Sequence, residues 1–136
     1  MKIWLKSLTR TTKLDTDLII DKMFIELDKP AYRIVKQSLN FVEFRQNMLL
    51  PNWNFNQFKY INGGRFRINP ETKTIVLFYY MELIYDVVIN SIILLLAVFK
   101  DSNFFYFFIA WGITLIIKLI SYRNIAKGII DRVASS

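Results

Sequence analysis

The chain has 136 residues and 54% hydrophobic residues, above the roughly 45–50% that is usual for globular domains. It contains no cysteine and no histidine, which excludes disulfides, iron–sulfur clusters, Cys/His zinc sites and catalytic dyads that depend on His or Cys. The net charge of +7 is concentrated in residues 1–80, which contain 13 basic and 7 acidic side chains. Such a region suits anionic lipid headgroups, nucleotides or nucleic acid, although a juxtamembrane charge bias is the simpler explanation.

Residues 1–14 are basic and lack the apolar core of a signal peptide, so we expect them to form a basic N-terminal tail. The following segment, residues 15–27, is predicted to be an amphipathic helix with apolar side chains along one face. Asp15 or Thr16 would cap this helix. Pro30 would end it, because proline disfavours the helical conformation in the residue before it.

Four antiparallel strands are predicted between the helix and residue 80. YRIVKQ (32–37) and FVEFRQ (41–46) flank a turn and indicate a β-hairpin, whereas residues 48–59 look irregular. NGGRFRI (62–68) is predicted to resume a strand after a turn at Gly63-Gly64, and TIVLFYY (74–80) to pair back on it after a turn at Asn69-Pro70. Residues 15–80 are therefore predicted to form a small α+β cytosolic domain of one helix and about four strands.

Residues 81–122 are predicted to form a transmembrane helical hairpin. Its apolar segments, 83–99 and 104–121, would be about 25–27 Å long as helices, near the short limit for a bilayer core of ~30 Å. Lys100 is the only basic residue in the short connector, so the positive-inside rule places the soluble domain and both termini in the cytoplasm. Residues 123–136 are predicted to be a cytoplasmic amphipathic tail. Aromatic residues near the two ends are interpreted as interfacial belts: Tyr79, Tyr80, Tyr85 and Tyr122, and Phe104 to Phe108.

A polar stripe interrupts the first apolar segment, because Glu82, Asp86 and Asn90 have the i, i+4, i+8 spacing of one helical face. In a symmetric hairpin centred near residue 102, Asp86 lies level with Lys118. These two charges are expected either to pair or to reach the interface separately. A third alternative is that the stripe faces a partner helix or a water-filled path in an oligomer.

Arg65 and Arg67 alternate onto one face of a predicted strand, near bulky aromatic residues. They could hold a phosphate or nucleotide bidentately, although a solvated outer face of the sheet is the simpler interpretation. The sequence contains no phosphate-binding loop, dinucleotide fingerprint or nucleic-acid module. Asp17 and Asp21 share a helix face but are explained by the first turns of a solvated helix. No catalytic residue, metal site or cofactor is predicted.

We therefore expect a membrane-anchored, non-enzymatic protein whose small basic cytosolic domain mediates an interaction or senses a ligand. The expected partners are the lipid bilayer, further copies of the chain, and an anionic ligand or lipid headgroup. The layout alone is similar to that of small two-span membrane effectors of antiviral signalling systems. This resemblance implies an alternative function, in which a β-rich domain senses a nucleotide signal and oligomerised, ligand-gated spans disrupt the membrane in a defence or toxin system.

Overall fold

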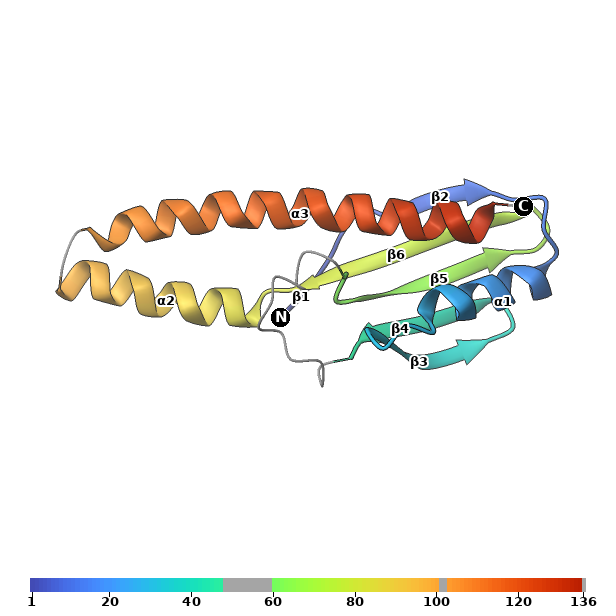
Figure 1. Ribbon diagram of the computed structural model, residues 1–136, viewed down its shortest axis with the longest axis horizontal. Coiled ribbons are helices and arrows are strands. Elements are labelled where there is room, and N and C mark those ends of the chain that lie inside the picture. The colour runs from blue at the N-terminus through green and yellow to red at the C-terminus, as the bar shows by residue number, and fades with distance from the viewer. Residues whose placement is uncertain (48–59, 101–102, 136) are drawn as a thin grey trace.

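The computed structural model shows an α+β fold with two layers, an antiparallel sheet and helices packed on one of its faces (Figure 1). It describes residues 1–47, 60–100 and 103–135, and the segment predicted to be irregular, 48–59, lies outside these ranges. The elements in chain order are β1 (Lys2–Trp4), β2 (Leu8–Thr11), α1 (Thr16–Leu27), β3 (Tyr32–Ser38), β4 (Phe41–Gln46), β5 (Gly63–Asn69), β6 (Thr74–Glu82), α2 (Ile84–Phe99) and α3 (Phe104–Ala134).

The six-stranded sheet has the order β1-β6-β5-β4-β3, and β2 pairs with β6 beside β1. Both predicted hairpins are confirmed, because β3 pairs with β4 and β5 with β6, all antiparallel. The turn after β5 forms as predicted, and the Asn69 side-chain oxygen accepts a hydrogen bond from the Glu71 N–H at 3.1 Å. The predicted helix is also confirmed as α1, whose buried face consists of Ile19, Met23 and Leu27.

Residues 1–14, which we expected to form a tail, instead supply two of the six strands. β1 and β2 pair in succession with one edge of β6, with Trp4 opposite Tyr80 and Thr11 opposite Thr74. Arg10 also donates a hydrogen bond to Asp131 of α3 at 2.5 Å. Strands of three and four residues that carry basic side chains resemble a solvated tail in sequence, and only the free edge of β6 supplies their backbone partners.

Gly63 and Gly64 lie inside β5, not in a turn before it, which corrects the prediction at this point. A Cβ atom added to Gly64 would lie 2.5 Å from the Phe78 carbonyl oxygen, and one added to Gly63 would lie 2.5 Å from the Tyr80 hydroxyl. Both positions therefore require glycine because β5 approaches its neighbours closely.

The helix α3 belongs to two parts of the molecule. Its C-terminal half packs against the sheet and α1 through five buried side chains: Tyr122, Ala126, Ile129, Ile130 and Val133. Its N-terminal half extends beyond the sheet and lies beside α2 (Figure 1). We call this projecting pair of helices, residues 84–120, the arm. The predicted tail 123–136 is thus helical to Ala134, and its apolar face covers the sheet instead of a lipid surface.

One helix, Phe105–Ala134, is long and apolar enough to cross a membrane by length and composition. The core helix of a soluble protein can meet the same limits, but only 11% of the most apolar window of this helix is buried. The prediction of two spans is corrected for α2, whose 16 residues reach only about 24 Å. The aromatic-belt interpretation fails for three tyrosines, which are buried in the fold: Tyr79, Tyr80 and Tyr122.

Candidate functional site

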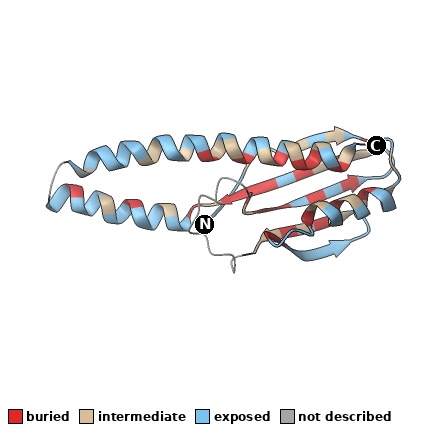
Figure 2. Cartoon of the chain, in the orientation of Figure 1, coloured by how far each residue is buried: buried red, intermediate tan, exposed pale blue. Residues whose placement is uncertain are grey.

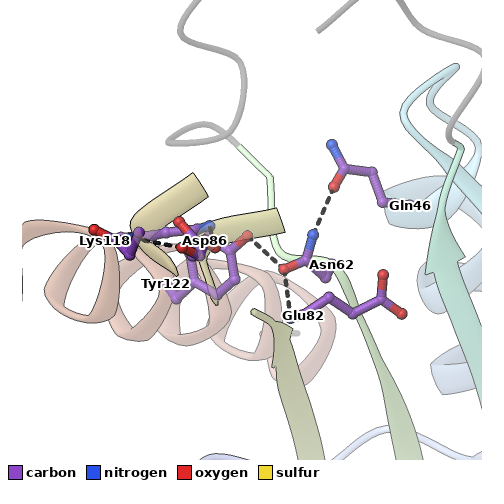
Figure 3. A network of polar contacts seen from close by, with 7 residues as sticks. Gln46, Asn62, Glu82, Asp86, Lys118 and Tyr122 are labelled. Atoms are coloured by element: carbon purple, nitrogen blue, oxygen red, sulfur yellow. Dashed lines mark hydrogen bonds and ion pairs between the residues drawn. The ribbon is translucent and has the colours of Figure 1, made fainter. Parts of the chain in front are cut away.

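The first candidate site is the neck, where the arm joins the sheet, and it contains the predicted pair Asp86 and Lys118. Lys118 Nζ donates to Asp86 Oδ2 at 3.1 Å (Figure 3). The side chain of Lys118 is 8% exposed and that of Asp86 is 23% exposed. The hairpin geometry thus brings these two residues together as the symmetric alignment predicts, and their charges do not reach solvent separately.

A third polar residue of the neck, Asn62, was missed by sequence reasoning. Its side-chain oxygen accepts hydrogen bonds from the Tyr122 hydroxyl at 2.8 Å and from the Glu82 N–H at 3.0 Å. Its amide group donates to Gln46 at 3.1 Å (Figure 3). Asn62 therefore joins β4, the end of β6 and α3 just below the arm. The dipeptide that follows it, Gly63-Gly64, made it look like an ordinary turn residue.

Asn90, the deepest member of the predicted polar stripe, is buried inside the hairpin with an exposed fraction of 5%. Its amide donates to the Asp86 carbonyl oxygen one turn earlier. Among the described residues, two buried side-chain polar atoms lack a hydrogen-bond partner, Asn90 Oδ1 and Trp111 Nε1, and both belong to the arm. Asp86 and Asn90 are therefore engaged within the hairpin and do not form an outward-facing stripe.

The second candidate site is the open face of the sheet, opposite α1 and α3, which carries Arg65 and Arg67. Strand register places Arg65 opposite Phe78 and Arg67 opposite Phe41, so these four side chains share one face. Arg65 donates to Glu43 at 2.7 Å, and its guanidinium carbon lies 5.5 Å from the centre of the Phe41 ring. The side chain of Arg67 makes no hydrogen bond or ion pair with the described residues.

A wide groove of about 1010 Å³ runs over this open face. Its lining extends from Trp4 on β1 to the turn between β5 and β6 at Asn69 and Pro70. The groove combines two arginines with three aromatic rings, those of Trp4, Phe41 and Phe78. Guanidinium groups bind phosphate, and aromatic rings stack on planar groups. This surface therefore has the side chains to bind a ligand that contains both.

The described residues offer little support for a metal site or a catalytic site. In residues 1–47, 60–100 and 103–135, no three acidic side chains are grouped so that they could hold a metal ion. Burial raises the pKa of Tyr32 to about 12, but its hydroxyl accepts the Ile61 N–H and lies in the core.

Comparison with protein-family models, curated proteins and solved structures gives no significant match for this chain.

Proposed function

We propose that the protein is a membrane-anchored, non-enzymatic protein whose arm inserts into a bilayer while the basic sheet domain stays outside it to bind a ligand or partner. The observation that carries this proposal is the surface of the arm. Of the 29 exposed large hydrophobic side chains in the described chain, 20 lie on the arm, 11 on α2 and 9 on α3. Most of the arm is coloured as exposed in Figure 2. Soluble monomers rarely expose one continuous apolar surface of this kind.

The position of the charges supports the same arrangement. Residues 84–120 contain only two basic residues, Lys100 at the tip and Lys118 at the neck, and the other 15 basic residues that the structure describes lie on the sheet side. Since the two ends of the described chain also lie on the sheet side, both would face the same compartment (Figure 1). The positive-inside rule makes this compartment the cytoplasm.

An arm of about 24 Å is shorter than a bilayer core of ~30 Å, so insertion requires local thinning of the bilayer. The ion pair between Asp86 and Lys118 lies near the base of the arm, where both charges would be close to the headgroup region. Their mutual neutralisation lowers the cost of placing them there.

A second candidate function, an oligomerising membrane-disrupting effector, is favoured by the unpartnered Asn90 Oδ1 and Trp111 Nε1 of the arm. Assembly in which the two helices of each arm repack against neighbouring arms would bring hydrogen-bond partners to these buried atoms. The inward orientation of Asp86 and Asn90 favours the anchor. Release of a dye from liposomes separates the two, because an anchor releases none at any protein density, whereas an effector releases dye and loses this activity with Asn90→Leu.

The anchoring role is tested by fractionation with an alkaline carbonate wash of full-length protein expressed in bacteria. Wild type should resist extraction, and Ile92→Arg/Ile113→Arg should be released, because each arginine costs about 2.5–3.5 kcal/mol near the bilayer centre. The matched control is Leu18→Arg/Ile25→Arg, at positions of α1 that are as exposed or more exposed, and it should fractionate as wild type does. Extraction of wild type, or equal behaviour of both double variants, would refute the proposal.

A further inference from the structure

We infer that the open face of the sheet binds a ligand made of nucleobases joined by phosphates, either a dinucleotide or a short single-stranded oligonucleotide. This inference deepens the proposed function, which leaves the ligand of the sheet domain open. It depends on the proposed membrane insertion only for the exclusion of lipid headgroups. Its evidence is the chemistry, the size and the position of the groove.

The chemistry of the groove alternates cationic and aromatic groups. Arg65 and Phe78 are cross-strand neighbours, and so are Arg67 and Phe41. The Arg65 guanidinium lies over the Phe41 ring, 5.5 Å from its centre. Trp4 adds a third ring and is 52% exposed. Bases stack on such rings whatever their identity, at about 1–3 kcal/mol per base, while guanidinium groups bind the phosphates between them.

Arg67 is the best phosphate ligand on this face. Its side chain makes no hydrogen bond or ion pair with the described residues, so all five N–H donors of the guanidinium group are available. Arg65 donates two hydrogen bonds to Glu43, at 2.7 and 3.2 Å, and its other N–H donors are available to a ligand. Glu71 is the one acidic residue among the described residues that line the groove. It lies at the turn and therefore favours a ligand whose phosphates lie over β5.

The size of the groove favours more than one nucleotide. Its volume of about 1010 Å³ is at the upper end of the ~300–1,000 Å³ range of small-molecule sites. Trp4 is level with Tyr80 and Asn69 is level with Thr74, so the two ends are six residues apart along β6. At about 3.3 Å per residue this is a length of about 20 Å.

The position of Arg67 keeps this arginine away from lipid headgroups if the arm is inserted. The strands run along the same direction as the arm, so the open face stands upright from the membrane (Figure 1). Arg67 is level with Val76, eight residues before the first residue of α2, about 26 Å from the base of the arm. This is about three Debye lengths at physiological salt.

The test uses full-length protein in detergent micelles and isothermal titration calorimetry with four probes: inorganic phosphate, AMP, the dinucleotide pApA and a single-stranded tetraribonucleotide. We expect saturable binding of pApA or the tetranucleotide, at least tenfold tighter than AMP or phosphate. The tighter of the two longer probes identifies the ligand size. Absence of binding by both longer probes, or equal affinity for AMP and for them, would overturn the inference.

Two charge reversals locate the site. Arg67→Glu should weaken binding by at least tenfold, because it replaces a phosphate donor by a like charge but removes no contact of the fold. The control is Lys127→Glu, an exposed position of α3 on the helix-covered side, which should bind as wild type does. Circular dichroism verifies that both variants are folded, and Phe78→Ala provides a charge-neutral test of stacking with the same expected direction. Equal effects of the two reversals would overturn the assignment of the site.

The binding result and the membrane result are independent. Wild type that resists carbonate extraction but binds neither longer probe would overturn the ligand inference alone. Wild type that binds the dinucleotide but is extracted by carbonate would overturn the anchor alone.

Discussion

Removal of one charge from the Asp86–Lys118 pair should destabilise the protein far more than removal of both. The paired atoms are 3.1 Å apart, and the side chains are only 23% and 8% exposed. At an effective dielectric constant of about 20, their attraction is about 5 kcal/mol before the cost of desolvation. Lys118→Met leaves Asp86 without its counter-ion, and such a loss costs about 3–5 kcal/mol. The double variant Asp86→Leu/Lys118→Met contains no unpaired charge and should be close to wild type.

The assay is a double-mutant cycle on full-length protein in detergent micelles, with chemical unfolding followed by circular dichroism. Asp131→Asn serves as a control, because it breaks an ion pair with Arg10 whose side chains are 44% and 36% exposed. This exposed pair should contribute no more than about 1 kcal/mol. The reasoning would be refuted if each single variant at the neck cost less than about 1 kcal/mol, or if the two costs simply added in the double variant.

Two further predictions concern the sheet domain. Gly64→Ala should lower the free energy of unfolding by about 1–3 kcal/mol, because its Cβ would lie 2.5 Å from a carbonyl oxygen. Gly112→Ala, where an added Cβ meets nothing within 4 Å, should leave stability unchanged or raise it, and equal effects in unfolding experiments would contradict this. Burial raises the pKa of Tyr32 to about 12, so the stability due to its neutral phenol is complete below pH ~10 and is lost as the pH rises through about 12. In unfolding experiments from pH 9 to 12, Tyr32→Phe should show a smaller decline than wild type, and identical declines would count against a buried neutral phenol.

The parts of the fold that were predictable are those with local signals. The apolar face of α1 and the two hairpins follow from periodicity and turn residues within about 20 positions of sequence. β1 and β2 have no such signal, because their partner, β6, is more than 60 residues away. The tyrosines assigned to a membrane belt show the same limit, since an aromatic residue near an apolar helix fits a membrane interface or a protein core equally well.

The candidate sites also differ in how far they could be predicted from local sequence. Asp86 and Lys118 could be paired from sequence because a short connector fixes which residues of two antiparallel helices are level. Asn62 and the groove could not be found, since they depend on strands and helices distant in sequence. The shared face of Arg65 and Arg67 was predictable from strand alternation, but which aromatic rings of β1, β4 and β6 share it was not.

The helix α3 is part of both the arm and the sheet domain, and this imposes an order on the biosynthesis of the protein. The half of the sheet that α1 covers, β3 and β4, is translated early and can bury its apolar face at once. The core face of β6 is covered by α3, which is translated only after α2 and the tip of the arm. β6 must therefore wait until both helices of the arm have left the ribosome. If the arm is delivered to a bilayer during translation, the soluble half of the molecule is completed on the membrane surface and not before it arrives there.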